Sequence, residues 1–500
     1  MKGWRVALFA AAANLLAGPA LAQQEPVVRT ALGSVRGELR EDGTSVFRGM
    51  PFAAPPVGVL RWRPPQPASS WRGVRAATRP GAACAQNSYG WNEADARRSS
   101  EDCLYLDVRT PRLGAGARLP VLVWIHGGSN RAGSGGDKVL ASFPLRGIVM
   151  VGVQYRLGAF GFVSHPELTA ESTERASGNY ALMDQVAALK WVRTNIAAFG
   201  GDPSNVTIVG DSAGAQDVGL LMVSPTARGL FAKAIQESGT AQFGWPARSL
   251  RENEEIGLQL QRLLGAHSLR DMREASTAQI LAADLRMSSA TITDQSYLWL
   301  QAVVDGRVVP APPHDLFAAG LSANVPLLLG SNARELTLPG GADQAEAYLR
   351  MAFGPREALA RSLYAFGGVA DPRLGDAYEQ LANDVTFRCP TVETARLQAR
   401  RGRAVYQYHF DHAEPDGSAV RHSGELAFVY DDLPVSPRDR RITMQAYWAN
   451  FARTGDPNAQ GLPRWPRFQE RERAYLEFSD DGPRAKTNLR GEICALLPRL

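Results

Sequence analysis

Five strongly apolar segments constrain the fold of this chain more than any other feature of its sequence. Two of them, Leu119–Gly128 (LPVLVWIHGG) and Gly147–Arg156 (GIVMVGVQYR), are apolar over most of their length, which is typical of strands buried on both faces of a sheet. The other three are Val206–Gly210, Val325–Asn332 and Arg403–Phe410. Between the second and third segments, apolar residues recur at helical spacing from about Tyr180. This alternation predicts an α/β protein with a central, mostly parallel sheet flanked by helices.

The N-terminal segment, residues 1–22, has the three parts of a signal peptide. Lys2 and Arg5 precede an apolar run, Val6–Leu16, and Ala20–Ala22 is a small-residue cleavage site. A membrane anchor is the alternative, but the run is short for a bilayer and is interrupted by Asn14. We therefore expect an exported protein, periplasmic or secreted, with no stable membrane insertion after the signal is removed.

Residues 23–500 contain no internal repeat, low-complexity tract or long linker, which favours a single domain. Within it, the stretch 240–313 has helical signals but weak strand signals, so we expect a cap or pocket-forming insertion there. The formal net charge of +5 comes from 55 basic and 50 acidic residues that are interspersed along the chain. The sequence contains no block of basic residues of the kind that predicts nucleic-acid binding. Nothing in the sequence specifies an oligomeric state.

Four cysteines, Cys84, Cys103, Cys389 and Cys494, would enter an oxidising compartment in an exported protein. Two disulfides are therefore expected, and the sequence by itself allows three pairings. A zinc site is not expected, because the chain has no Cys-x-x-Cys spacing and no histidine cluster near the cysteines.

The segment Val206–Gly210 runs into Gly-Asp-Ser-Ala-Gly, which places Ser212 between two glycines. By itself this pattern is weak evidence for a nucleophile, because a chain with 48 glycines can contain it by chance. Here it follows a β-branched strand and precedes small residues, Ala213 to Ala215, which predicts a strand–turn–helix that exposes the serine oxygen above the sheet. A tight turn without chemistry is the alternative; we interpret Ser212 as a nucleophile.

A serine hydroxyl needs a base, and with this motif the expected chain order is nucleophile, acid, histidine. His422, in a polar loop after the last of the five apolar segments, is the predicted base. The other downstream histidines fit core, surface or insertion positions: His267, His314, His409 and His412. Glu335, which follows the segment Val325–Asn332, is the predicted acid. Asp305 is the alternative acid, although its Asp-Gly sequence favours a turn.

A tetrahedral intermediate on Ser212 would also need N–H donors for its oxyanion. The Ala213 backbone N–H follows the nucleophile directly. A second group is expected in the loop His126–Ser129, whose glycines allow close approach of the backbone. His126 itself is interpreted as bracing this loop. The chemistry needs no metal and no organic cofactor.

Two long motifs connect these residues to a known family. Phe199–Gly214 (FGGDPSNVTIVGDSAG) and Glu101–Pro111 (EDCLYLDVRTP) resemble the two signature sequences of type-B carboxylesterases, the cholinesterase-like branch of the α/β hydrolases. Similarity continues through WIHGG, YRLGAFGF, HSGELAFVY and YWANFARTGDPN, and thus over nearly all of residues 23–500.

This resemblance implies an α/β-hydrolase fold that hydrolyses small-molecule carboxylic esters through an acyl-enzyme. It implies a catalytic triad of Ser212, Glu335 and His422. The other implied roles are oxyanion donors at Gly128, Ser129 and Ala213, a turn shaped by Gly127, disulfides Cys84–Cys103 and Cys389–Cys494, and support of the triad by Ser238.

The chain departs from the family pattern near the site. Ser129 and Asn130 replace the third glycine and the aromatic residue of HGGGF, and Arg334 replaces the usual aspartate before the triad glutamate. Asp211 replaces the commoner glutamate before the nucleophile. Trp91 resembles the choline-stacking tryptophan of cholinesterases, but its flanking residues differ, so no choline substrate is inferred.

The candidate pocket residues are Trp91, Asn130, Phe243 and Trp245. Two alternatives to an esterase stay open at the level of sequence. One is a catalytically inactive, adhesion-type binding homologue, and the other is an amide hydrolase or acyltransferase that uses the same residues.

Overall fold

The computed structural model of the chain describes residues 25–136, 139–141, 143–243, 246–287, 303–336, 341–413, 420–430 and 444–497. The expected signal peptide, the pocket candidate Trp245 and residues 288–302 of the expected insertion lie outside the described residues.

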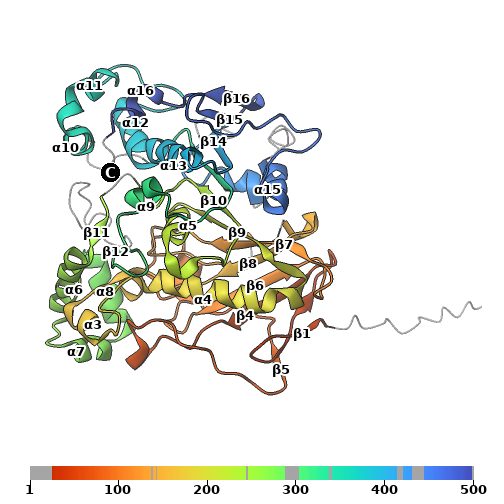
Figure 1. Cartoon of the computed structure of the whole chain (residues 1–500). Helices are drawn as coiled ribbons and strands as arrows, with labels where there is room; N and C mark the ends of the chain where they lie inside the picture. The colour runs from red at the N-terminus through yellow and green to blue at the C-terminus, as the bar shows by residue number, and fades with distance from the viewer. Residues whose placement is uncertain are drawn as a thin grey trace, which may run out of the picture.

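An eleven-stranded sheet crosses the centre of the molecule (Figure 1). Its strand order is β16-β15-β14-β13-β10-β9-β7-β8-β6-β4-β3. Seven neighbouring strands are parallel: β8 (Val149–Val153), β7 (Leu119–Ile125), β9 (Gly201–Asp211), β10 (Lys233–Glu237), β13 (Leu327–Asn332), β14 (Val405–Asp411) and β15 (Ala474–Ser479). The edges are antiparallel: β3 (Glu38–Leu39), β4 (Ser45–Pro51) and β6 (Tyr105–Thr110) on one side, β16 (Gly482–Thr487) on the other. The predicted mostly parallel sheet is thus confirmed.

Side chains of the central strands alternate between two hydrophobic layers. On β7, Val121, Val123 and Ile125 pack into one cluster, whereas Leu122 and Trp124 pack into the other. This period of two follows from the pleat, and because both faces are covered, both sets are apolar. One layer contains α4 (Tyr180–Asn195) and α5 (Ala213–Val223), and the other contains α14 (Leu426–Tyr430) and α15 (Met444–Thr454).

The helix expected from about Tyr180 is confirmed as α4. The remaining short elements are β1 (Val27–Arg29), β2 (Ser34–Arg36) and β5 (Val74–Ala76), which form a small separate sheet, and the helices α1 (Glu93–Arg97), α2 (Gly158–Phe162), α3 (Pro166–Glu171) and α16 (Gly491–Cys494). No helix in the described ranges is both long and apolar enough to cross a membrane.

Two groups of helices leave the sheet at the same end of the molecule (Figure 1). The first lies between β10 and β13 and comprises β11 (Arg248–Ser249), α6 (Leu250–Leu264), α7 (Leu269–Glu274), α8 (Thr277–Met287), β12 (Val303–Val304) and α9 (Pro313–Ala319). The second lies between β13 and β14 and comprises α10 (Gly341–Phe353), α11 (Glu357–Ser362), α12 (Ala377–Asn383) and α13 (Cys389–Arg400). The first overlaps the stretch 240–313, where an insertion was expected, and continues to Ala319, whereas the second was not anticipated and has its own small core.

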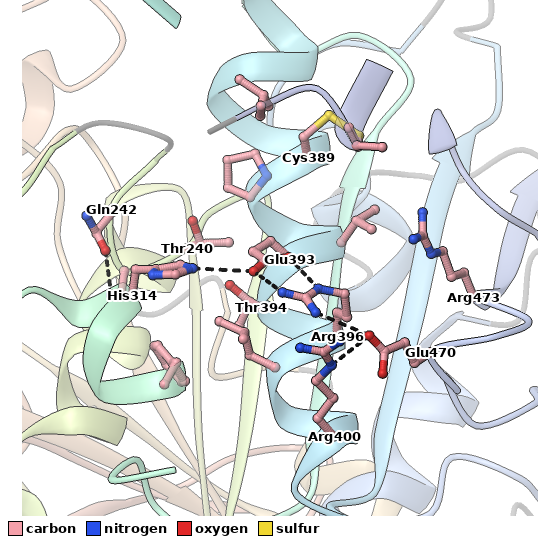
Figure 2. A pocket seen from close by; sticks show the side chains of 18 of the residues that line it. Thr240, Gln242, His314, Cys389, Glu393, Thr394, Arg396, Arg400, Glu470 and Arg473 are labelled. Atoms are coloured by element: carbon pink, nitrogen blue, oxygen red, sulfur yellow. Dashed lines mark hydrogen bonds and ion pairs between the residues drawn. A yellow bond between two sulfur atoms is a disulfide. The ribbon is translucent and has the colours of Figure 1, made fainter. Parts of the chain in front are cut away.

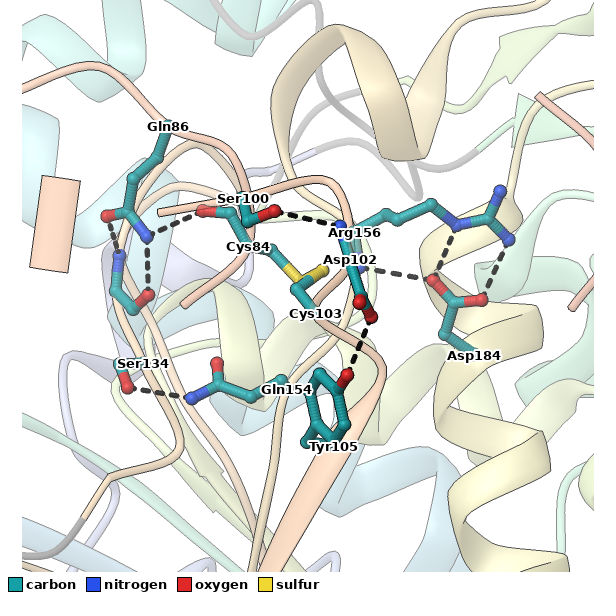
Figure 3. Close-up of a disulfide and its surroundings, with 11 residues drawn as sticks. Cys84, Gln86, Ser100, Asp102, Cys103, Tyr105, Ser134, Gln154, Arg156 and Asp184 are labelled. Carbon is teal, nitrogen blue, oxygen red and sulfur yellow. Dashed lines mark hydrogen bonds and ion pairs between the residues drawn. A yellow bond between two sulfur atoms is a disulfide. The ribbon is translucent and has the colours of Figure 1, made fainter. Parts of the chain in front are cut away.

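Both disulfides implied by the family resemblance are present. Cys84–Cys103 closes a loop with a sequence separation of 19, beside the chain that leads into β6 (Figure 3). Cys389–Cys494 joins the first residue of α13 to the end of α16, with a separation of 105. Their presence is consistent with an exported protein.

The two disulfides should differ in their contribution to stability. In the chain-entropy description, cross-linking the longer loop stabilises the native state by about 5 kcal/mol and the shorter loop by about 3 kcal/mol. We therefore expect the Cys389→Ser/Cys494→Ser variant to lose more free energy of unfolding than the Cys84→Ser/Cys103→Ser variant. Urea-induced unfolding of both would measure this, and a larger loss for the shorter loop would contradict it.

Candidate functional site

Ser212 occupies a sharp turn between β9 and α5. Its backbone, with φ 56° and ψ −123°, lies outside the ordinary regions for a residue with a side chain. The turn requires close contacts that only glycines allow: a Cβ atom on Gly210 would lie 2.5 Å from the carbonyl carbon of Gly214, and one on Gly214 would lie 2.0 Å from the Ile125 oxygen. The Ser212 N–H donates to the Glu237 carbonyl at 2.8 Å. The predicted strand–turn–helix around Ser212 is therefore present.

The structure brings His422 and Glu335 to Ser212 from two other loops of the sheet. His422, in the loop between β14 and α14, has its Nε2 atom 2.8 Å from Ser212 Oγ and its Nδ1 atom 2.7 Å from Glu335 Oε2. Glu335 follows β13, and its other carboxylate oxygen accepts from the Asn332 N–H at 2.6 Å. The Glu335 side chain is fully buried, whereas that of His422 is 20% exposed.

The electrostatic environment favours a protonated imidazole at His422. Burial lowers the pKa of His422, but the hydrogen bond and charge of Glu335 outweigh this, together with the charges of Asp211 and Glu425, and raise the pKa to about 9. A charge formed on the imidazole is thus stabilised where it lies next to Ser212.

Two buried acids, Asp211 and Glu425, lie behind these three residues. Glu425 accepts from Ser238 Oγ at 2.9 Å and from Asn332 Nδ2 at 2.6 Å, and Asp211 accepts from the Ser423 hydroxyl at 2.7 Å. Burial is the main cause that raises the pKa of Glu425 to about 8 and that of Asp211 to about 6. Ser238 is therefore connected to the site by its hydrogen bond to Glu425.

Sequence reasoning did not identify Glu425 or Ser423. Both lie within three residues of His422 in the sequence His-Ser-Gly-Glu, so the available signal was an acid and a hydroxyl close to the candidate base. Arg334, which precedes Glu335, points elsewhere: its guanidinium binds Glu379 of α12 at 2.5 Å. It anchors the second helical group and makes no hydrogen bond to Glu335.

The loop after β7 packs directly against the Ser212 turn. A Cβ atom on Gly127 would lie 2.6 Å from the Asp211 carbonyl oxygen and 3.1 Å from Ser212 Cβ. Gly128 and Ser129 have φ values of +104° and +57°. Within the described part of the chain, their N–H groups make no hydrogen bond, and Ala213, as the first residue of α5, has no intrahelical acceptor for its own.

The aromatic candidates lie near this loop and near His422. A Cβ atom on Gly128 would lie 3.0 Å from Cη2 of Trp91, whose side chain is largely exposed. Phe243 packs edge to face on Phe387 at 5.5 Å, and Phe387 lies 5.2 Å from the His422 ring. Asn130 differs from its expected place in the pocket: it is buried, with 1% exposed, and binds Asp217 of α5.

A charged cavity of about 740 Å³ is lined by Thr240, Gln242 and residues of α13 (Figure 2). Its wall carries a chain of ion pairs that runs from His314 through Glu393, Arg396 and Glu470 to Arg400. None of the three residues Ser212, Glu335 and His422 lines this cavity. His314, one of the downstream histidines, therefore pairs with Glu393 and lies outside the candidate site.

Within the described ranges, no group of three or more acidic, histidine or cysteine side chains is placed to hold a metal ion.

The sheet order, the serine turn after a central parallel strand and the loops that meet it define the α/β-hydrolase fold. Comparisons with known proteins agree. The profile of the carboxylesterase family matches residues 24–347 and 368–497. Liver carboxylesterase of Sus scrofa is 35% identical, over 94% of this chain and 92% of that protein. Carboxylesterase 1D of Rattus norvegicus is 34% identical, over 91% of this chain and 89% of that protein.

Solved structures are similar over the same extent. Carboxylesterase EST55 of Geobacillus stearothermophilus matches with a TM-score of 0.83 and 32% identity. The match covers 94% of this chain and 100% of the EST55 chain. A PNB esterase structure has a TM-score of 0.80 and 30% identity, with the same coverage. The chain belongs to the carboxylesterase family. It is a carboxylic ester hydrolase, as the sequence motifs indicated.

The environment of His422 can be tested directly. We expect its imidazole to titrate near pH 9, because of the Glu335 carboxylate, and to titrate closer to the ordinary value of about 6.5 in Glu335→Gln. Histidine NMR of the seven-histidine chain would measure this, with His422→Ala to assign the signal. An unchanged pKa in Glu335→Gln would contradict the assigned cause.

Proposed function

We propose that Ser212, His422 and Glu335 act as the catalytic triad for ester hydrolysis. The observation that carries this proposal is the position of the His422 ring, which is hydrogen-bonded to Ser212 Oγ at 2.8 Å and to Glu335 Oε2 at 2.7 Å. In this role Glu335 accepts the Nδ1–H of His422, which leaves Nε2 as the acceptor of the serine proton. Glu335 orients the imidazole and does not itself take the proton.

The first half-reaction transfers the acyl group to the enzyme. The neutral form of His422, whose share increases as the pH rises toward its pKa of about 9, removes the proton from Ser212 through Nε2. Ser212 Oγ then attacks the ester carbonyl carbon and forms a tetrahedral intermediate. When the intermediate collapses, the imidazolium gives its proton to the leaving alcohol oxygen, and the acyl group remains on Ser212. In the second half-reaction, His422 removes a proton from water, the resulting oxygen attacks the acyl carbon, and the acid departs as Ser212 recovers its proton.

The oxyanion of both intermediates is proposed to bind the backbone N–H groups of Gly128, Ser129 and Ala213. Each is without an internal hydrogen-bond partner in the described part of the chain. Gly127 allows the loop to lie against the Ser212 turn. Such fixed donors each contribute about 100- to 1,000-fold to turnover, because they face the charge that develops in the transition state.

Small-molecule esters are the substrate class of this family, and we propose that Trp91, Phe243 and Phe387 contact them. The stretch of about residues 240–313, which contains most of the first helical group, is proposed as the cap, and Phe387, between α12 and α13, as part of the pocket wall beside His422. The complete set of hydrogen-bonded triad side chains argues against an inactive binding homologue. No observation favours an amide or an acyl acceptor other than water.

We propose that residues 1–22 direct the chain out of the cytoplasm, to the periplasm or the medium. This proposal is supported by the basic, apolar and small-residue parts of the segment and by the two disulfides.

Removal of the Ser212 hydroxyl tests the triad. Ser212→Ala should fold normally yet lose essentially all turnover of p-nitrophenyl acetate, together with covalent labelling by a fluorophosphonate, because no nucleophile remains. Ser362→Ala, a change of an exposed serine on α11, is the matched control and should keep both. Turnover or labelling retained by Ser212→Ala would refute the proposed mechanism.

Trp91 should affect substrates with an aromatic alcohol more than others. A ring stacked on Trp91 contributes about 0.5–1.5 kcal/mol, so Trp91→Ala should raise KM for a naphthyl ester about 2- to 10-fold and leave kcat within about 2-fold. KM for ethyl acetate should change little. Equal effects on both esters would show that Trp91 does not contact the alcohol group.

A further inference from the structure

Asp217 is a buried carboxylate on the helix that begins after Ser212. Its side chain is fully buried, and within the described residues no charged side chain contributes to its pKa. It accepts from Asn130 Nδ2 at 3.3 Å and from Gln185 Nε2 at 2.5 Å. Burial raises the pKa of Asp217 to about 7, against the effect of these two hydrogen bonds. A buried carboxylate without a charged partner is costly to the folded state.

Asn130, one of its two partners, directly follows the proposed oxyanion donor Ser129. Both residues adopt the left-handed conformation, with φ values of +56° and +57°. This conformation costs about 1–2 kcal/mol per residue with a side chain, and asparagine tolerates it best. The loop therefore requires anchors that offset the strain.

Three contacts anchor Asn130. Its carbonyl oxygen accepts from the Gly158 N–H at 2.7 Å, and its Oδ1 atom lies 3.4 Å from the Tyr155 hydroxyl, which also donates to the His126 carbonyl at 2.5 Å. The third contact is with Asp217. Among these three contacts, it is the one that joins the loop after β7 to α5. Its acceptor is a carboxyl group, which in the ionised form makes stronger hydrogen bonds than a neutral acceptor.

The link to α5 is significant because α5 supplies the other half of the proposed oxyanion site. Ala213 is the first residue of α5, and Asp217 lies four residues further along the same helix. The bond between Asp217 and Asn130 therefore links the loop that carries the Gly128 and Ser129 N–H groups to the helix that begins with Ala213.

We propose that Asp217 is a positioning residue for ester hydrolysis, which holds Asn130 and thereby keeps the Gly128 and Ser129 N–H groups aimed at the oxyanion. This proposal rests on the proposed function of Ser212 and its oxyanion donors. Asp217 does not touch the reacting atoms; it acts through Asn130.

The exchange Asp217→Asn separates positioning from core stability. It keeps the size of the side chain and removes a buried charge, so the free energy of unfolding should stay the same or rise. In an assay at about pH 9, where the Asp217 carboxyl is ionised, the exchange makes the bond to Asn130 neutral and weaker, so kcat for p-nitrophenyl acetate should fall about 10- to 100-fold while KM stays within about 2-fold. Opposite directions for kcat and stability are not expected of a residue that only fills the core.

A double-mutant cycle tests whether Asp217 acts through Asn130. Asn130→Gly preserves the left-handed backbone and removes the side chain that Asp217 holds, so it should lower kcat to a similar degree. In the Asn130→Gly background, Asp217→Asn should lower kcat by less than about 2-fold, because the contact is already absent. Asp107→Asn, a buried acid on β6 that accepts from the Gly49 N–H, is the control and should retain kcat.

The proposal is overturned if folded Asp217→Asn keeps the wild-type kcat, if its loss of kcat multiplies with that of Asn130→Gly, or if kcat and stability fall together. If Asp217→Asn does not fold, Asn130→Asp decides, because it keeps an oxygen for Tyr155 and removes the Nδ2 donor to Asp217; a wild-type kcat for Asn130→Asp overturns the proposal. Failure of the triad proposal would appear separately, as turnover retained by Ser212→Ala.

Discussion

The hydrogen-bonded chain from Ser212 through His422 to Glu335 is the arrangement on which the rest of the site depends. Its three members follow the carboxyl ends of β9, β14 and β13, and parallel strands end at the same edge of a sheet. The register of β13 with β14, in which Asn332 pairs with Phe410, brings the loops of Glu335 and His422 together. Pairing of these buried strands thus places residues that are far apart in sequence at hydrogen-bond distance from one another.

Burial raises the pKa values of several carboxylates around the hydrogen-bonded triad. Glu237 supplies the backbone oxygen that holds Ser212, and its side chain accepts from Trp448 Nε1 at 2.6 Å. Burial raises the pKa of Glu237 well above the ordinary value, and the same cause acts on Asp211 and Glu425. The Glu335 carboxylate, which is hydrogen-bonded to the ring, is the main partner of the imidazolium, and the charges of Asp211 and Glu425 add to its effect.

Much of the fold could be predicted because its central strands are apolar at nearly every position. β10 was harder to detect, since Lys233 and Glu237 stand at its two ends and are nevertheless buried. Helices α10–α13 were not anticipated either, because their hydrophobic face packs on a small local core and the strand signals on either side dominated. Asn130 was expected beside the substrate, but the left-handed backbone turns its side chain toward α5. Side-chain direction of this kind depends on backbone torsions that residue spacing does not encode.

The sequence by itself determined the strand–turn–helix around Ser212, the order of nucleophile, acid and histidine, and the family, because these depend on local residue types and their order along the chain. Only the tertiary structure decided which buried groups meet. It joined Ser238 and Asn332 through Glu425, turned Arg334 toward Glu379 and connected Asp217 to Asn130. Each of these contacts joins segments from different strands or helices, whose approach is set by packing and burial of the whole sheet.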